Sequence, residues 1–368
     1  MSTFFNPILQ GRIRTAFVII LIWIFIGALT AVYEYLFLSN FPGVTESQPM
    51  ENYSFLGSLI TAVVWAFMGG SFFAAFELFY FQERLERKSF IQIVAIKLVI
   101  YSLMLVVLSL FASFLYNSLS ISAPFWDSRV IERVISFMTG WSFWHPILPF
   151  IALVLLTLFI IQINYKFGRG ELWKFIKGEY FHPKEEVRIF MFLDLNSSTT
   201  IAEKIGHIKF FNLLNDFFQD ITNDIIMHKG QIVDYVGDEI IISWNLKEGL
   251  EKGYCIECYY AMEKRIAELS HIYEQKYGIR PTFKAGMHCG MATIGEIGKI
   301  KKEIVFSGDV MNTTARIQSL CNEKGHQLVI SEDLQSRLPK SRFPIIELGE
   351  IVLKGKLSAT KVFGVEGA

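Results

Sequence analysis

Two aspartates in the C-terminal half are placed where their carboxylates can bind a metal ion together. Asp194 ends an apolar run that is typical of a buried strand, and Asp238 lies at the tip of a predicted hairpin. A strand–helix–strand crossover between them would set these strands side by side. Carboxylate oxygens with no Cys or His nearby suit Mg²⁺ or Mn²⁺. A pair of such ions is the usual device for in-line displacement at phosphorus.

Four short motifs, taken in order, sharpen this interpretation. They are FLDLNSST (192–199), YVGDE (235–239), GDVMNTTAR (308–316) and LKGK (353–356). Their order and spacing resemble those of the class III adenylate and guanylate cyclases, over about residues 187–365. The resemblance depends on an N-x-x-x-R element on a predicted helix, combined with two metal-type aspartates and a terminal K-G-K.

The resemblance implies a metal and phosphate site. Asp194 and Asp238 match the family's metal-binding aspartates, and the backbone carbonyl of Leu195 would help to hold one of two Mg²⁺ or Mn²⁺ ions per active site. Phosphates would be bound by a lysine and by backbone N–H groups at a helix N-terminus, where such groups are free to bind anions. The matching residues are Asn196, Ser197, Ser198 and Thr199, with Lys354 or Lys356, of which we favour Lys356.

Asn312 and Arg316 match the pair that the family uses at the transition state. Asn312 would position the ribose, and Arg316 would meet the charge that develops on the α-phosphate. They lie four residues apart and so share one helix face, and the planar fork of arginine can bind two phosphate oxygens at once. The implied reaction is attack of the ribose 3′-hydroxyl on the α-phosphorus of a purine nucleoside triphosphate. It releases pyrophosphate and leaves a 3′,5′-cyclic nucleotide.

In this family the metal aspartates and the Asn/Arg pair of one site come from different subunits. The resemblance therefore implies an obligate homodimer with two symmetric sites at its interface. A basic, glycine-rich hairpin at about Gly295–Glu303 matches the arm through which the family dimerises.

The two positions that select the purine depart from the family pattern. Adenylate cyclases usually carry Lys at the first and Asp or Thr at the second, and guanylate cyclases carry Glu and Cys. This chain has Asp234 and Val305. A carboxylate at 234 can accept hydrogen bonds from guanine or from the adenine amino group, so the choice between ATP and GTP stays open. We favour ATP because adenylate cyclases are the commoner bacterial-type members. The phosphate loop also departs, since Ser197 and Ser198 stand where Gly and Phe are usual.

Other functions fit the motifs less well. A diguanylate cyclase has a related palm-like fold, but YVGDEI lacks its double-glycine signature, and the Asn312/Arg316 and LKGK elements have no place in it. A degenerate cyclase domain that only binds nucleotide at the membrane is a further alternative. We disfavour it because every metal, ribose and phosphate position is filled.

The elements around these motifs predict a ferredoxin-like, palm-type α/β domain at residues 187–368. Strands are expected at 187–195, in the hairpin 231–244, and at 280–290, 303–309, 327–331, 345–355 and 359–365. Helices are expected at 199–230, at about Leu250–Lys276 and from about Val310. Cys255 and Cys258 have C-x-x-C spacing, but they lie within a helical pattern, so we expect packing rather than zinc or redox chemistry.

The N-terminal half predicts a membrane domain. The 52% hydrophobic fraction exceeds that of an ordinary soluble chain, and the long apolar runs concentrate in residues 1–168. A spanning helix needs about 20 mostly apolar residues. Four segments qualify: about Thr15–Leu38, Leu56–Phe81, Ile91–Tyr116 and Pro146–Tyr165. We therefore predict a four-helix transmembrane domain at 1–168 and a short linker at 169–186, with an external loop at Ser118–His145 that contains an interfacial helix.

The positions of Lys and Arg predict the orientation, because cytoplasmic loops carry an excess of both. They gather before the first span, between the second and third, and after the fourth, whereas residues 40–54 have none. Both termini and the catalytic domain are thus expected in the cytoplasm of a multi-pass inner-membrane protein. The partners are then the lipid bilayer and a nucleotide. Zero net charge and the lack of a basic stripe give no sign of nucleic-acid binding.

Three ionisable residues, Glu34, Glu77 and Lys97, lie within the predicted spans. Such groups are functional candidates in a membrane. We nevertheless expect Glu34 and Glu77 to reach the membrane surface, since both lie near the ends of their spans.

Overall fold

The computed structural model describes residues 7–40, 54–81, 88–144, 147–167, 177–300, 302–339, 342–352 and 359–367. The chain divides into two compact units, one covering Leu9–Leu172 and the other containing Trp173–Ala368. We call them the membrane unit and the catalytic unit. The dividing point falls within the predicted linker, while the predicted domain bounds stay a prediction.

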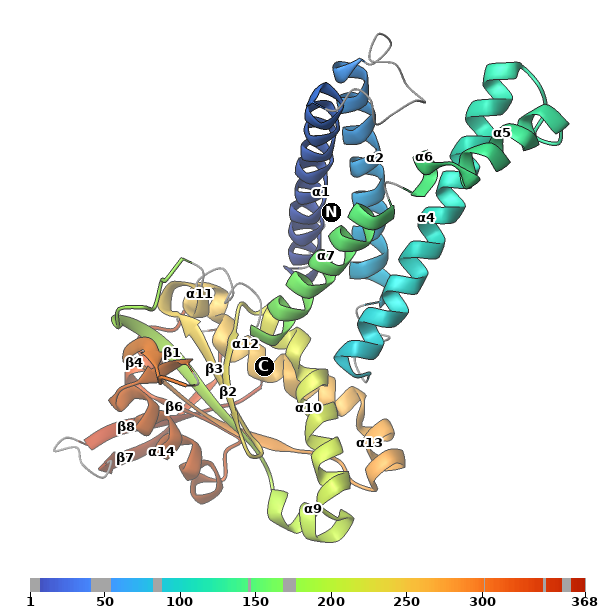
Figure 1. Cartoon of the computed structure of the whole chain (residues 1–368). Helices are drawn as coiled ribbons and strands as arrows, with labels where there is room; N and C mark the ends of the chain where they lie inside the picture. Colours follow the sequence, from blue (N-terminus) through green and yellow to red (C-terminus); the bar gives the residue numbers. More distant parts are fainter. Residues whose placement is uncertain are drawn as a thin grey trace. The chain divides into compact units, whose positions relative to one another are not determined.

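In the residues that the structure describes, the regular elements of the membrane unit are all helices (Figure 1). Its elements are α1 (Pro7–Asn40), α2 (Phe55–Phe76), the π-helix η2 (Glu77–Phe81), α4 (Phe90–Ile121), α5 (Ser128–Thr139), α6 (Trp141–Trp144) and α7 (Ile147–Phe167). Three stretches are long and apolar enough to cross a membrane: Leu9–Leu36, Phe55–Phe81 and Phe90–Ile121. The apolar helix Pro149–Ile163 within α7 is shorter. Three candidate spans are therefore present, and the fourth stays a prediction.

Small residues let α1 and α2 approach each other closely. A Cβ atom on Gly70 would lie 3.0 Å from Cβ of Trp23, and one on Gly27 would lie 2.7 Å from Cβ of Ala66. Glycine at helix contacts in membranes allows such close backbone packing. The indole N–H of Trp23 also donates to Oγ1 of Thr157 on α7, at 3.3 Å.

Glu77 is buried among the helices of the membrane unit, and its depth in the membrane stays a prediction. The side chain is fully buried at the start of η2, where it forms an ion pair with Lys97 of α4. The hydroxyl of Tyr101 donates to the second carboxylate oxygen of Glu77 at 2.9 Å. Burial of one charge is tolerable here because the opposite charge is buried beside it. Glu34, in contrast, is exposed on α1.

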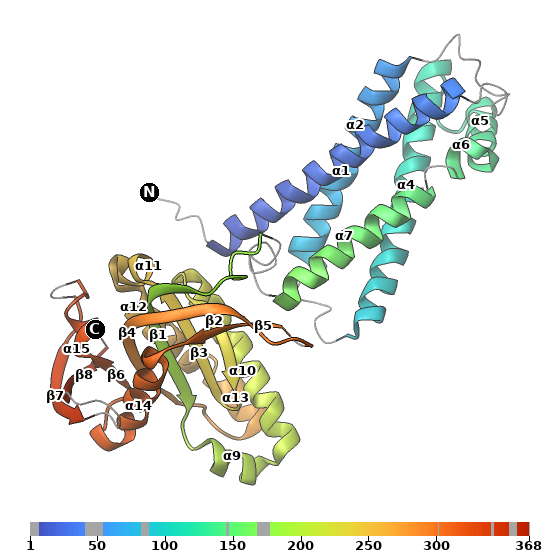
Figure 2. The same ribbon diagram turned by 60° about the vertical axis from the view of Figure 1, so that its left-hand side comes forward.

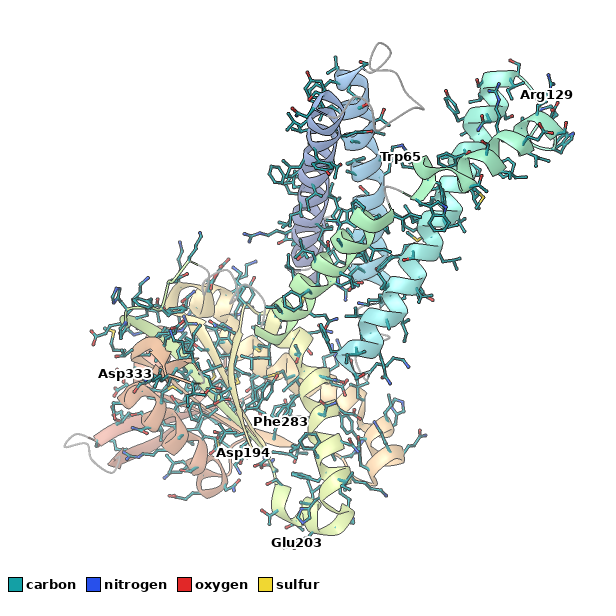
Figure 3. The ribbon with its side chains drawn as sticks, viewed as in Figure 1. Trp65, Arg129, Asp194, Glu203, Phe283 and Asp333 are labelled. Carbon is teal, nitrogen blue, oxygen red and sulfur yellow. The ribbon has the colours of Figure 1, made fainter. Side chains whose placement is uncertain are left out.

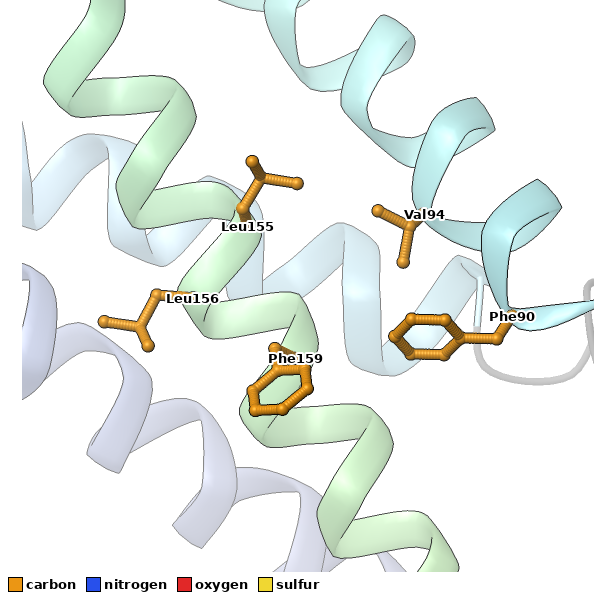
Figure 4. Close-up of a pocket in the computed structure, with 5 residues that line it drawn as sticks. All are labelled: Phe90, Val94, Leu155, Leu156 and Phe159. Atoms are coloured by element: carbon orange, nitrogen blue, oxygen red, sulfur yellow. The ribbon is translucent and has the colours of Figure 1, made fainter.

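An apolar groove of about 350 Å³ lies between α4 and α7 (Figure 4). It is lined by Phe90, Val94, Leu155, Leu156 and Phe159. These side chains have no ionisable group and no hydrogen-bonding atom. The groove is therefore unsuited to a nucleotide or a metal ion.

The catalytic unit is built on a mixed sheet of eight strands, in the order β2-β3-β1-β4-β6-β8-β7, with β5 paired to β4 (Figure 2). The strands are β1 (Lys184–Leu195), β2 (Gln231–Val236), β3 (Glu239–Asn245), β4 (Phe283–Ile297), β5 (Glu303–Ser307), β6 (Leu328–Ser331), β7 (Ile345–Val352) and β8 (Ala359–Val365). The helices are α9 (Ser198–Ile205), α10 (His207–Met227), α11 (Leu246–Leu250), η3 (Glu251–Gly253), α12 (Tyr254–Glu268), α13 (Ser270–Tyr277), α14 (Asp309–Lys324) and α15 (Glu332–Gln335).

The side chains of β1 alternate between two cores, as the period of a strand requires. Ile189, Met191 and Leu193 pack into the larger core with residues of α10 and α12. Phe190 and Phe192 face the opposite core, which includes residues of β5 and α14. The central strand is thus covered on both faces, and this explains its continuous apolar sequence.

Three details differ from the sequence prediction. The first helix is divided at Gly206, whose φ of 83° lies in the region that glycine adopts readily. The helix predicted at Leu250–Lys276 is divided into η3, α12 and α13. The neighbour of β1 is β3, and β2 lies outside it at the edge. The hairpin therefore pairs with β1 through its second strand.

The C-x-x-C pair lies in the core, as expected. Cys255 and Cys258 are fully buried on α12. Burial raises the pKa of the Cys255 thiol to about 12 and that of Cys258 well above its usual value. Reactive and metal-binding cysteines need the thiolate form, so both residues behave as packing residues.

Candidate active site

The two aspartates meet where β1 ends and the β2–β3 hairpin turns. Asp194 pairs across the sheet with Glu239, the residue that follows Asp238. Gly237 has a φ of 66°, which lets the chain reverse in the two-residue loop Gly237–Asp238. The carboxylates of Asp194 and Asp238 lie within hydrogen-bonding reach of each other. The structure therefore brings the two predicted residues together; Asp194 is labelled in Figure 3.

Two donors from other elements hold the Asp194 carboxylate. The Lys284 ammonium of β4 lies 3.0 Å from Oδ2 of Asp194, and the Gln318 amide of α14 donates to the same oxygen at 3.0 Å. Burial raises the pKa of Asp194, Lys284 opposes this rise, and the nearby Asp238 adds to it, with a net upward shift. The site thus has more negative charge than one lysine neutralises.

Glu239 adds a third carboxyl group beside the pair. Burial is the main reason that its pKa rises to about 7, and the charges of Asp194 and Asp238 raise it further. Carboxylates that crowd together disfavour one another's ionised form. A divalent cation would relieve this repulsion.

The donor set fits a hard divalent cation. Asp194 and Asp238 supply oxygen ligands, which Mg²⁺ and Mn²⁺ prefer. Mg²⁺ is commonly held by one or two carboxylates together with substrate phosphates rather than by an all-protein cage. The described residues contain no group of three or more His, Cys, Asp or Glu side chains arranged to hold a metal. The Leu195 carbonyl stays a predicted ligand.

The predicted phosphate loop follows directly after β1. The backbone N–H of Asn196 donates to the carbonyl of Thr282 at 2.8 Å, because the chain still follows the edge of β4 there. This N–H has a backbone partner in the sheet, and a phosphate-binding role for Asn196 stays a prediction. Ser197 follows with a φ of 56°, and α9 begins at Ser198. The first N–H groups of a helix have no partner within it, so Ser197, Ser198 and Thr199 also remain predicted phosphate-binding residues.

Asn312 and Arg316 both lie on α14, as predicted, with Asn312 exposed and Arg316 half-buried. The helix begins at Asp309, directly after β5. On the other face of the helix, Thr313, Thr314 and Ile317 are buried. The two side chains are thus carried on the side of a helix whose other face is fixed in the core.

The predicted base-selecting residues lie on two different strands. Asp234 is exposed on the edge strand β2, and its carboxylate accepts from the N–H of Tyr235 at 2.8 Å. Val305 is half-buried on β5, where it pairs with Gly295 of β4. Lys354 and Lys356 lie outside the described residues.

Comparison with known proteins identifies the family to which this chain belongs. The family model of the adenylate and guanylate cyclase catalytic domain matches residues 179–366. This chain is a member of the adenylate and guanylate cyclase family. Its catalytic unit is accordingly a cyclase domain, which is a lyase domain, and cyclases of this class generally use divalent metal ions.

Curated cyclases of both substrate types are similar to this cyclase domain. Adenylate cyclase 2 of Rhizobium meliloti (strain 1021) is 34% identical over 200 residues, which make up 54% of this chain and 55% of that protein. The receptor-type guanylate cyclase gcy-6 of Caenorhabditis elegans is 28% identical over 186 residues, which make up 49% of this chain and 17% of that protein. The match thus spans about half the length of the first relative and much less of the second.

A solved structure has the same fold. A bacterial light-regulated adenylyl cyclase aligns with a TM-score of 0.51 and 19% sequence identity, covering 60% of this chain and 64% of that one. At this identity the likeness shows the fold of the cyclase domain alone.

Sequence reasoning missed three residues of the site: Glu239, Lys284 and Gln318. Each left a signal in the sequence. Glu239 directly follows Asp238, Lys284 is a charge inside an otherwise apolar strand, and Gln318 lies two residues after Arg316 on the same helix. What the sequence could not supply was the strand order that places all three around Asp194.

Proposed function

We propose that this chain is a membrane-anchored adenylate cyclase that converts ATP into 3′,5′-cyclic AMP and pyrophosphate. The observation that carries the proposal is the Asp194–Asp238 pair, which lies at the end of β1 in a domain of the cyclase family. A divalent cation at this pair would lower the charge of the triphosphate and of the 3′-oxygen. Asp194 and Asp238 bind and orient that cation, and Lys284 balances the charge of the site when the cation is absent.

Asn312 and Arg316 act on the ribose and on the α-phosphate. Asn312 orients the ribose so that its 3′-hydroxyl faces the α-phosphate, and the fixed guanidinium of Arg316 stabilises charge that develops there. Ser197, Ser198 and Thr199 bind the terminal phosphates through backbone N–H groups, together with Lys356 or Lys354. Two ions per site and a homodimer, in which each site takes its aspartates from one subunit and its Asn/Arg pair from the other, complete the proposal.

The choice of ATP rests on the similarity to adenylate cyclase 2 of Rhizobium meliloti. A guanylate cyclase is the second candidate, and one observation favours it. Asp234 is acidic, like the Glu that guanylate cyclases carry at this position, and its exposed carboxylate can accept from the guanine edge.

The membrane unit is proposed to anchor the enzyme in the inner membrane. Its three long apolar helices support a multi-pass protein, with α7 as the fourth span and with both termini and the cyclase domain in the cytoplasm. This orientation gives the active site access to cellular nucleotides.

The test is an assay of the purified full-length chain with ATP or GTP, in the presence of Mn²⁺ or Mg²⁺. Mass spectrometry identifies the product. The proposal expects 3′,5′-cyclic AMP and pyrophosphate in equal amounts, dependent on the metal. Cyclic GMP alone would establish the second candidate, and no cyclic product with either substrate would refute both.

A further inference from the structure

Gln318 is a buried amide that contacts the proposed metal site from an unexpected direction. Only 7% of the residue is exposed, and Nε2 donates to Oδ2 of Asp194 at 3.0 Å. It comes from α14, the helix that carries Asn312 and Arg316, and not from β1 or the hairpin. The same oxygen accepts from Lys284, which lies across the sheet on β4.

The position of Gln318 is fixed by close packing between α14 and β4. A Cβ atom on Gly286 would lie 2.2 Å from the backbone nitrogen of Gln318, so only glycine leaves room for the helix there. One turn farther along α14, the Cys321 thiol lies 3.3 Å from the carbonyl oxygen of Ala285. A donor held this firmly limits the rotation of the carboxylate that it contacts.

A bound cation would affect the two hydrogen-bond donors to Asp194 differently. The Lys284 ammonium is positive, so it is repelled by a divalent cation and competes with it for the carboxylate. The amide of Gln318 carries no net charge and can keep its hydrogen bond while the cation is bound. Carboxylates that bind metals are typically held by such neighbouring hydrogen bonds, and losing one costs about 10–100-fold in metal affinity or activity.

We propose that Gln318 is a positioning residue, which holds the Asp194 carboxylate in the orientation that binds the divalent cation. The proposal rests on the metal role given to Asp194 in the proposed function. It also means that α14 serves two purposes, since it presents Asn312 and Arg316 on one side and steadies Asp194 on the other.

The experiment measures Mn²⁺ binding by the full-length chain directly, from the electron paramagnetic resonance signal of free Mn²⁺, with no nucleotide present. Gln318→Met keeps the approximate shape without a donor, and Gln318→Asn keeps an amide that is one methylene too short. The matched control is Asn322→Ala, an exposed position on the same helix. Asp194→Ala identifies the part of the binding that belongs to this site.

We expect both Gln318 variants to bind Mn²⁺ about 10–100-fold more weakly than the wild type at the site that Asp194→Ala removes, and the control to bind normally. Turnover should need correspondingly more Mn²⁺ to reach its half-maximal rate. Unchanged Mn²⁺ affinity in both variants, with or without a loss of thermal stability, would reduce Gln318 to a packing residue and overturn the proposal. So would an Asp194→Ala chain that binds Mn²⁺ like the wild type.

The Mn²⁺-binding measurement tests this inference separately from the proposed function. Weakened Mn²⁺ binding in the Gln318 variants of a chain that makes no cyclic nucleotide would support the positioning role and refute the cyclase activity. If the wild-type chain is an active cyclase and the Gln318 variants bind Mn²⁺ normally, the cyclase activity is supported and the positioning role is refuted.

Discussion

The Nζ atom of Lys284 lies 3.0 Å from Oδ2 of Asp194, across the pairing of β4 with β1. This one ammonium group faces a cluster of carboxyl groups that also includes Asp238 and Glu239. Its charge stabilises the folded domain without a cation, and it opposes the cation when one arrives. If the proposed cation binds here, Lys284 links the stability of the domain to that cation.

Replacing Lys284 by Met should destabilise the metal-free protein. A hydrogen bond to a charged group contributes about 1.5–3 kcal/mol, and its loss leaves the carboxylates to repel one another. Thermal unfolding of the full-length chain in EDTA should show the loss, and added Mn²⁺ should raise the stability of Lys284→Met more than that of the wild type.

The matched control is Lys302→Met, which removes a more exposed lysine that pairs with Glu296. Surface pairs of this kind contribute about 0–1 kcal/mol, so the control should unfold near the wild-type temperature. If Mn²⁺ stabilises Lys284→Met and wild type equally, the lysine and the cation do not share Asp194.

Asp234 should influence the choice of purine. A hydrogen bond to an ionised carboxylate is worth roughly 1.5–3 kcal/mol, which corresponds to a change of about tenfold or more in relative rate. Asp234→Lys should favour ATP, because the ammonium can donate to adenine N1 and not to the N1–H of guanine. The measurement is kcat/KM for ATP and GTP in wild type, Asp234→Ala and Asp234→Lys. An ATP/GTP ratio that is the same in all three would show that this residue does not read the base.

Shared active sites predict that two inactive chains can complement each other. In a heterodimer of an Asp194→Ala chain and an Arg316→Ala chain, one site carries both defects and the other carries none. Co-expression should therefore restore part of the activity that each variant lacks alone. The control is proof by two-tag purification that heterodimers form. No recovery in the purified heterodimer would place each complete site within a single chain.

The buried ion pair of Glu77 and Lys97 should matter mainly through its balance of charge. Lys97→Met alone leaves a buried carboxylate without its partner, and breaking a buried pair typically costs about 3–5 kcal/mol. The double variant Glu77→Gln/Lys97→Met removes both charges and keeps an acceptor for the hydroxyl of Tyr101. Thermal unfolding of the purified chain in detergent should show a large loss for each single variant and recovery in the double variant. A double variant as unstable as Lys97→Met would contradict this account.

Much of the fold was predictable because its signals are local. The apolar run of β1, the Gly237–Asp238 turn and the apolar helices are all visible in short windows of sequence. The division at Gly206 was missed although its cause is local, since this glycine has a φ of 83°. The outer position of β2 was missed because it depends on how distant strands pair. The burial of Glu77 was missed for the same reason, because its partner Lys97 comes from another helix.

The residues of the candidate site also fall into those that the sequence predicted and those that it did not. Motifs located Asp194, Asp238, Asn312 and Arg316 on the elements where the structure has them. Lys284 and Gln318 carry no motif of their own, and only the pairing of β1 with β4 and the packing of α14 bring them to Asp194. The hydrogen bond from the Asn196 N–H to the carbonyl of Thr282 could not be foreseen either, because it depends on the same strand pairing.

The most direct test of the central claim is the rate of cyclic nucleotide formation by Asp194→Ala and Asp238→Ala, measured with the purified full-length chain at saturating Mn²⁺ and ATP. Thermal unfolding confirms that each variant is folded. Because both carboxylates are proposed to hold the cations that the reaction needs, each variant should fall to the background rate while remaining folded. Either variant that retains more than a few per cent of the wild-type rate would contradict the assignment of this pair as the reaction centre.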